Sequence, residues 1–200
     1  MAKKDEIKWN KKYQETPSLL EERRPSEKLI EIIQKVKGKK ALDVASGTGR
    51  NSVYLAANGF EVDALDISQV ALDSLKSKGF ENISCKLVDL DEYEVPENSY
   101  DFIVMTNFLD RNIIVKLSNA LKNDGILFIE TYMHDIVNEK PPSNPDFLLK
   151  KDELKTFFDD SFEVLDYDEF LNEEDELYRM KKQSIAIRKL WFLQRILFYI

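Results

Sequence analysis

Apolar residues along the chain follow two periods, one typical of buried strands and one typical of helices. Short apolar runs predict strands at 40–45, 60–66, 83–88, 100–106 and 126–132. Between these runs the apolar positions recur with helical spacing, which predicts a helix after a cap at Ser26, others over 51–58 and 68–78, and one ending at Leu121. Strands that alternate with helices in this way predict a parallel sheet with right-handed crossovers.

A tight turn is expected at 123–125, before the fifth predicted strand. The pattern changes after residue 132, where prolines at 141, 142 and 145 predict a loop and 151–158 predicts a short helix. Segments 162–170 and 184–190 predict strands with only the acidic loop 172–175 between them, so we expect them to pair as an antiparallel hairpin. The predicted fold is α/β: a doubly wound, mostly parallel seven-stranded sheet with an antiparallel C-terminal hairpin.

Composition narrows the function classes. The 200 residues suffice for one well-packed domain, 1–200. A net charge of −8, from 29 basic and 37 acidic residues, opposes binding to nucleic acids. Cys85 and His134 are the only residues of their types, so no disulfide and no cysteine- or histidine-rich metal site is expected. Because no signal peptide and no apolar run of roughly 20 residues is found, we expect no membrane span and a cytoplasmic location.

The turn after the first predicted strand is rich in glycine. The strand 42–45 leads into Ser46-Gly47-Thr48-Gly49, and a helix begins near Asn51. Glycines allow the backbone to approach a ligand closely, and the helix N-terminus offers free N–H groups. Position 52 is serine, so this is not the three-glycine dinucleotide fingerprint.

Polar side chains follow the next three predicted strands. Asp66 ends the second strand, where a carboxylate can accept both hydrogens of a ribose diol; the alternative is a helix-capping acid. Asp89 follows the third strand and can accept from an adenine amino group, or it is a turn aspartate. Asn107 follows the fourth strand, near where a reaction would occur, or it simply begins a loop.

The run from Leu42 to Ser52 resembles motif I of the class I S-adenosylmethionine-dependent methyltransferases. Its continuation through Asp66, together with the segments 88–90, 100–103 and 147–154, is similar to the tellurite-resistance methyltransferase branch in order and spacing. The resemblance covers about residues 9–190 and implies S-adenosylmethionine as cofactor. It also implies the residues that bind this cofactor: Ala45, Ser46, Gly47, Gly49, Arg50, Asn51, Asp66, Ile67, Asp89, Leu90 and Asn107.

Individual roles follow from the same resemblance. Ala45, Gly47 and Gly49 would border the methionine part, and Arg50 is a candidate partner for its carboxylate. Asp66 would hold the ribose and Asp89 the adenine amino group. Ile67 and Leu90 would pack on the adenine ring, and Asn107 would lie near the sulfonium.

The acceptor side is less specific. The branch carries a His-Arg pair where this chain reads Tyr178-Arg179, so tellurite or selenium chemistry is not implied. For a neutral acceptor His134 is the leading candidate base, and Tyr132, Tyr178 and Glu130 are further candidates. We expect catalytic roles for His134, Tyr132 and Arg179, and substrate or lid roles for Trp9, Tyr13, Phe147 and Tyr178. Residues 1–25 form the predicted lid segment, and 134–183 the acceptor-side insert and hairpin.

The predicted function is methyl transfer from S-adenosylmethionine to a small molecule. The alternatives are a protein that senses S-adenosylmethionine without catalysis and, less favoured by the missing third glycine, an NAD-dependent oxidoreductase. The apolar tail 191–200 is too short to span a bilayer. We expect it to pack on its own domain, with a weak dimer or surface contact as the alternative.

Overall fold

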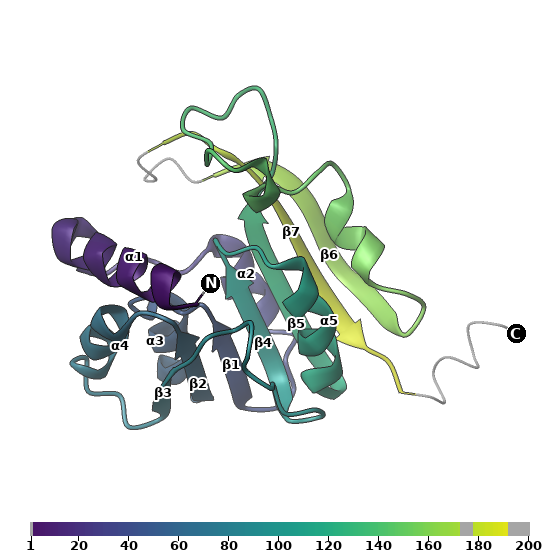
Figure 1. Cartoon of the computed structure of the whole chain (residues 1–200). Coiled ribbons are helices and arrows are strands. Elements are labelled where there is room, and N and C mark those ends of the chain that lie inside the picture. Colours follow the sequence, from purple (N-terminus) through teal and green to yellow (C-terminus); the bar gives the residue numbers. More distant parts are fainter. Residues whose placement is uncertain (1, 173–177, 192–200) are drawn as a thin grey trace, which may run out of the picture.

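One mixed sheet organises the molecule. The computed structural model describes residues 2–172 and 178–191, and within them the strands follow the order β3-β2-β1-β4-β5-β7-β6 (Figure 1). The strands are β1 Lys40–Val44, β2 Glu61–Asp66, β3 Ile83–Leu87, β4 Tyr100–Thr106, β5 Leu121–Tyr132, β6 Phe162–Leu171 and β7 Lys181–Lys189. Strands β1 to β5 are parallel where they pair, whereas β7 runs antiparallel to both β5 and β6. The predicted doubly wound sheet with its antiparallel end is confirmed.

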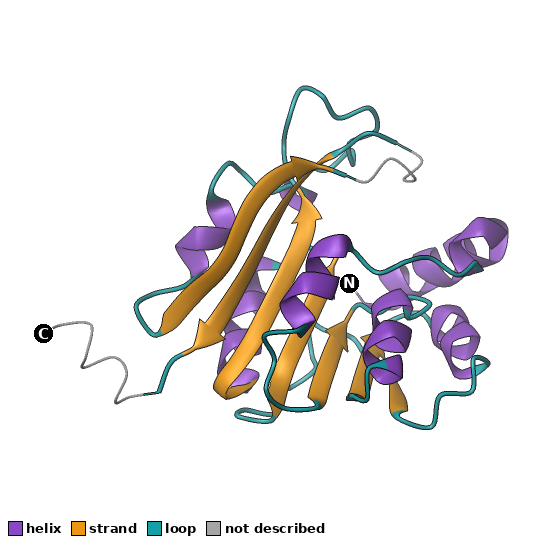
Figure 2. Ribbon diagram, turned by 180° about the vertical axis from the view of Figure 1, so that it is seen from behind, coloured by secondary structure: helices purple, strands orange, loops and turns teal. Residues whose placement is uncertain are grey.

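Helices cover both faces of this sheet (Figure 2). The α-helices are α1 Ala2–Glu15, α2 Glu27–Ile33, α3 Arg50–Ala57, α4 Gln69–Lys76 and α5 Arg111–Ala120. Short 3-10 helices lie at Pro17–Leu20, Pro145–Phe147 and Glu153–Phe157. Leu29 of α2 and Leu55 of α3 belong to a core with Phe102 on one face, whereas Ile113 and Leu117 of α5 belong to the core on the other. Because successive side chains of a strand point to opposite faces, the apolar residues of the buried strands contribute to two separate cores, one on each face of the sheet.

The predicted serine caps hold two of the helices in place. Ser26 Oγ accepts from Leu29 N at 3.1 Å and begins α2, and Ser68 Oγ accepts from Ala71 N at 3.2 Å and begins α4. Such caps satisfy backbone donors that have no partner inside the helix. Because Ser68 comes directly after β2, its cap also fixes the chain at the carboxyl end of that strand.

Three boundaries differ from the sequence prediction. The expected turn at 123–125 is an irregularity inside β5, where the register with β4 shifts and Asp124 has φ of 64°. The helix expected over 151–158 is the shorter 3-10 helix Glu153–Phe157. Strand β7 begins at Lys181 instead of 184. The prediction missed its start because residues 182–184 are polar yet buried inside the sheet, and a buried strand is recognised from apolar residues.

None of the described residues belongs to a helix that is long and apolar enough to cross a membrane. Of the apolar tail, only Trp191 lies within the described residues, where it is exposed, so the predicted role of 191–200 stays a prediction.

Candidate functional site

The glycine loop after β1 is held in an unusual backbone conformation. Ala45, Gly47 and Gly49 have φ of 54°, 55° and 79°, the left-handed region that glycine adopts without strain. Ser46 N donates to Leu65 O at 2.8 Å, and Gly49 N donates to Ser46 O at 2.9 Å. The loop is thereby tied to β2 and delivers the chain directly into the first turn of α3.

Asp66, at the end of β2, closes the loop from the other side. Its Oδ2 accepts from Gly47 N at 2.7 Å and its Oδ1 accepts from Ser68 N at 2.8 Å. Burial raises the pKa of this carboxyl, and the hydrogen bonds from Ser68 and Gly47 oppose that rise. A carboxylate oxygen has a second lone pair, so Asp66 can still accept from a ligand hydroxyl while it holds the loop.

A second carboxyl lies beneath the loop. Asp43 of β1 is fully buried, and its Oδ2 accepts from Ser52 Oγ at 2.6 Å. Burial raises the pKa of Asp43 to about 7, against the opposing hydrogen bonds of Ser52 and the charge of Arg50. The site therefore rests on an acid whose charge changes near neutral pH.

Several buried polar atoms around the loop have no hydrogen-bond partner in the described part of the chain. They are Ser46 Oγ, Arg50 Nη2 and Asn51 Oδ1. Buried polar groups in folded proteins are normally satisfied, so such a group calls for water, an ion or a ligand. A guanidinium nitrogen in this position suits a ligand with a carboxylate, because arginine binds carboxylates with charge-assisted hydrogen bonds.

The later strand ends continue the same edge. Val88 N donates to Asp66 O at 2.9 Å, which brings Asp89 and Leu90 next to β2, and Asp89 Oδ1 accepts from Asp91 N at 3.1 Å. Asn51 Nδ2 donates to Thr106 Oγ1 at 2.8 Å and so joins α3 to the end of β4. Asn107 follows in the left-handed conformation, with φ of 55°, and is exposed. The predicted cofactor residues of four strands thus lie along one edge.

Helix α1 lies against this edge beside α4 (Figure 1). Asn10 Oδ1 accepts from Ser68 Oγ at 2.8 Å and from Val70 N at 3.2 Å, which fixes the helix to the start of α4. A Cβ added to Gly47 would lie 2.7 Å from Tyr13 Oη, so the tyrosine hydroxyl reaches the glycine loop. Burial, with a contribution from Asp66, raises the pKa of Tyr13 to about 12, so this hydroxyl keeps its proton.

The rest of α1 presents Trp9 and two lysines near the same place. The Trp9 and Tyr13 ring centroids are 6.1 Å apart, and Lys12 Nζ lies 4.6 Å from the Trp9 ring. Burial and the positive charges of Lys8 and Lys140 lower the pKa of Lys12. Since Lys140 belongs to the loop after β5, this helix and that loop approach each other over the site.

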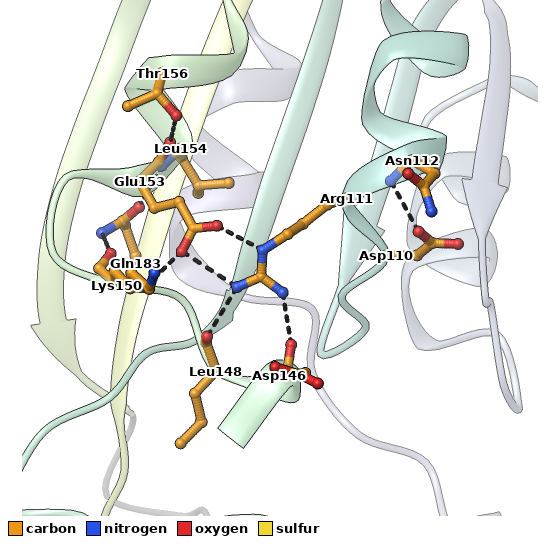
Figure 3. Close-up of polar contacts among 10 residues, drawn as sticks. All are labelled: Asp110, Arg111, Asn112, Asp146, Leu148, Lys150, Glu153, Leu154, Thr156 and Gln183. Atoms are coloured by element: carbon orange, nitrogen blue, oxygen red, sulfur yellow. Dashed lines mark hydrogen bonds and ion pairs between the residues drawn. The ribbon is translucent and has the colours of Figure 1, made fainter. Parts of the chain in front are cut away.

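Arg111 anchors the segment that follows that loop (Figure 3). Its Nε donates to Glu153 Oε1 at 2.6 Å, and its two terminal nitrogens donate to the backbone oxygens of Asp146 and Leu148 at 2.6 and 3.1 Å. Gln183 of β7 accepts from Leu154 N at 2.7 Å. Residues 146–154 are thus fixed to the start of α5 and to the sheet.

The predicted acceptor-side residues are more scattered. His134 and Arg179 are exposed; their backbone N–H groups donate to Leu149 O at 2.8 Å and to Glu139 Oε2 at 2.9 Å. Phe147 is exposed on the segment that Arg111 holds, and Tyr178 Oη accepts from Lys140 Nζ at 3.0 Å. Tyr132 ends β5 and is partly buried. Within residues 2–172 and 178–191, no hydrogen bond or ion pair joins His134, Phe147 or Arg179 to the glycine loop, so their roles stay predictions.

Sequence reasoning missed several residues that build the site. Asn10, Ser52 and Arg111 make the side-chain hydrogen bonds described above, yet each is an ordinary polar residue in its own segment. Ser52 offered a signal: it lies nine positions after Asp43, across a strand-turn-helix unit, where the first turn of the helix packs beside the strand. The partners of Asn10 and Arg111 lie about 40 to 60 residues away and left no local pattern.

Comparison with known proteins places the chain among relatives of similar fold. The family described as tellurite resistance protein TehB matches residues 1–193. A probable S-adenosyl-L-methionine-dependent methyltransferase TehB of Haemophilus influenzae strain 10810 is 34% identical over 145 residues, which cover 67% of this chain and 49% of that relative. The chain therefore spans about half the length of the curated relatives that it matches.

Solved structures agree with this placement. The crystal structure of TehB from Haemophilus influenzae has a TM-score of 0.71 at 28% identity and covers 82% of this chain and 62% of that one. A SAM-dependent methyltransferase from Methanosarcina mazei has a TM-score of 0.66 at 18% identity, covering 84% and 99% of the two chains, and shows the shared fold alone.

Proposed function

The chain belongs to the family described as tellurite resistance protein TehB, and on that premise we propose that it transfers the methyl group of S-adenosylmethionine to a small-molecule acceptor. The observation that carries the proposal is that the glycine loop, Asp66 and Arg50 lie together at one edge of the sheet. Asp66 is bonded to Gly47 N while a buried Arg50 nitrogen has no partner in the described part of the chain. A ribose beside the carboxylate and a carboxylate beside the guanidinium would satisfy both, and S-adenosylmethionine carries these two groups.

The residues of the edge divide the cofactor between them. Asp66 would hold the ribose, Arg50 the carboxylate, and Asp89 with Ile67 and Leu90 the adenine. When bound, S-adenosylmethionine supplies an activated methyl group on a sulfonium, so the protein's work is to position the acceptor and exclude water. Tyr13 and α1 cover the loop, in keeping with that second task. We also propose that the protein acts on a small molecule and that it does so in the cytoplasm.

Thermal shift and methyl transfer test the proposed function together. We expect S-adenosylhomocysteine to raise the melting temperature of the purified protein and NAD to leave it unchanged, because a ligand that binds only the folded state stabilises it. Labelled S-adenosylmethionine should then pass label to a member of a metabolite panel. A shift with NAD alone would point to the oxidoreductase alternative, and binding without any labelled product would point to a sensor.

Arg50 should affect binding of the amino acid part of the ligand only. We expect Arg50→Met to weaken S-adenosylhomocysteine binding by about tenfold to a hundredfold, the effect of losing one charge-assisted hydrogen bond of about 1.5–3 kcal/mol. Calorimetry with 5′-methylthioadenosine, which lacks the amino acid part, is the matched control and should give equal affinities for the two proteins. A loss of equal size for both ligands would mean that Arg50 acts on the fold of the loop instead.

The lid contact of α1 gives a separate prediction. Asn10→Ala removes the two hydrogen bonds to Ser68 and Val70, so α1 should leave the site more often and S-adenosylhomocysteine should bind about fivefold to twentyfold more weakly, as expected for one to two net hydrogen bonds. Lys11→Ala, on the exposed side of the same helix, is the control. Equal affinities for Asn10→Ala and the unaltered protein, measured by calorimetry, would refute the lid.

A further inference from the structure

A row of polar side chains, partly buried on β4 and fully buried on β5 and β7, crosses three strands next to the proposed cofactor site. Thr106 at the end of β4 is the register partner of Glu130 on β5, and Glu130 is the register partner of Ser184 on β7. Register partners direct their side chains to the same face of a sheet, so these three lie side by side. Asn51 extends the row at one end through its hydrogen bond to Thr106 Oγ1.

The members of this row on β5 and β7 are deeply buried and incompletely bonded. Glu130 is 1% exposed and Ser184 0%. Lys182 Nζ lies 3.2 Å from Glu130 Oε1 and offsets the charge of the carboxylate. Glu130 Oε2, Ser184 Oγ and Asn51 Oδ1, however, have no hydrogen-bond partner in the described part of the chain. Buried polar groups are costly when unpaired, so open atoms on neighbouring strands indicate a place that a ligand completes.

The row runs from the cofactor side toward β7. Asn51 follows the glycine loop, whereas Glu130 and Ser184 lie beyond β4 on the strands farther from Asp66. Asn107, which begins the loop after β4, donates its backbone N–H to Glu130 O at 2.8 Å. A group bound by Glu130 Oε2 would therefore lie on the side of β4 opposite the nucleotide, where a methyl acceptor is needed.

On the basis of the proposed function, we propose that Glu130 and Ser184 bind the methyl acceptor and that this acceptor is protic, a hydroxyl or an amine. Glu130 Oε2 and Asn51 Oδ1 can only accept hydrogen bonds, so the ligand must supply the hydrogens. An oxyanion without hydrogens has none to donate, and the carboxylate would repel it. The open atoms thus favour a protic group over an oxyanion such as tellurite.

In the proposed methyl transfer Glu130 acts as the base. The acceptor heteroatom forms its bond to the methyl carbon as the bond from that carbon to the sulfonium sulfur breaks, and both electrons of the broken bond stay on sulfur. The proton of the heteroatom passes to Glu130 Oε2, which later releases it to water. Positioned bases of this kind contribute about a hundredfold to ten-thousandfold in rate.

The charged surroundings of Glu130 are limited among the described residues. Lys182 of β7 faces it directly. One strand farther, Asp168 of β6 is the register partner of Ser184 and lies 2.9 Å from Lys28 Nζ of α2.

Ser184→Ala provides a test that does not disturb the ion pair. The variant deletes a hydroxyl that has no hydrogen-bond partner among the described residues, so the melting temperature without ligand should stay equal or rise. KM for the acceptor should increase about tenfold, the effect of one lost hydrogen bond. Ser118→Ala removes another buried serine, one that donates to Val115 O within α5, and should leave KM unchanged. A lower melting temperature with unchanged KM would contradict the assignment of Ser184.

Glu130→Gln tests the base. The acceptors are a panel of small amines and alcohols, beginning with ethanolamine, and potassium tellurite is the oxyanion probe. We expect transfer to a panel member, a kcat at least about a hundredfold lower in the variant, and unchanged S-adenosylhomocysteine affinity. Transfer to tellurite alone, transfer to no probe, or an unchanged kcat in the variant would overturn the proposal. Failure of S-adenosylhomocysteine to bind even the unaltered protein would instead refute the proposed function.

Discussion

Replacing Gly49 with alanine is expected to abolish ligand binding and to lower the free energy of unfolding by at least about 3 kcal/mol, the combined size of left-handed strain and overpacking. Gly49 has φ of 79°, and a Cβ there would overlap Leu75 Cδ1 and lie 2.9 Å from Leu75 Cγ. Leu75 is itself buried in α4, so it cannot turn into solvent. The loop must then move, and with it the start of α3. Urea unfolding and calorimetry with S-adenosylhomocysteine measure the two effects.

Gly59→Ala separates backbone strain from crowding. Gly59 has the same φ of 79°, but a Cβ there meets nothing within 4 Å. This control should cost only the strain of a left-handed alanine, about 1–2 kcal/mol, and should leave ligand affinity unchanged. If the two variants lose equal stability, the contact between the glycine loop and Leu75 contributes nothing, and the close packing inferred here is wrong.

Asp43→Asn is expected to remove a large pH dependence of stability. An unfolded aspartate has a pKa of about 3.9, whereas burial raises that of Asp43 to about 7 in the folded protein. Since the folded state holds the proton more tightly, the contribution of Asp43 to stability is fully present below the unfolded pKa and is lost as pH rises through 7. Relative to the variant, the unaltered protein should lose about 3 kcal/mol between pH 5 and pH 8.

Urea unfolding of both proteins at these two pH values checks this difference. Asp63→Asn is the control. Although burial opposes the shift, the Tyr100 hydroxyl and the charges of Lys40 and Lys86 lower the pKa of Asp63, so its contribution is lost only as pH falls below the unfolded pKa of about 3.9 and should stay constant between pH 5 and pH 8. Parallel stability curves for Asp43→Asn and the unaltered protein would show that Asp43 is ionised in the fold throughout this range.

The fold was largely predictable because its signals are local. Strands β1 to β5 are apolar runs between caps and glycines, and a run of this kind needs no partner to be recognised. Strand β7 was harder, since Lys182, Gln183 and Ser184 are buried and polar, and only tertiary packing places them inside the sheet. The short helix Glu153–Phe157 was overestimated because Arg111, far away in sequence, fixes that segment.

The site divides in the same way. The glycine loop and Asp66 could be read from the sequence because both sit at strand ends whose spacing is fixed by one strand-helix-strand unit. The buried row could not, because Thr106, Glu130 and Ser184 become neighbours only through strand pairing. Glu130 was one candidate base among several, and nothing in its own segment distinguished it from His134.

The strand order also constrains how the protein is made. Strand β6 precedes β7 in the chain, yet within the described residues it pairs with β7 alone, and β7 lies between it and β5. A nascent chain that has released β6 from the ribosome therefore offers this strand no sheet to join, while the outer edge of β5 stays open. Open edges of this kind invite association with other chains. We expect partially synthesised chains to rely on chaperones until residues 181–189 emerge and bring the two edges together.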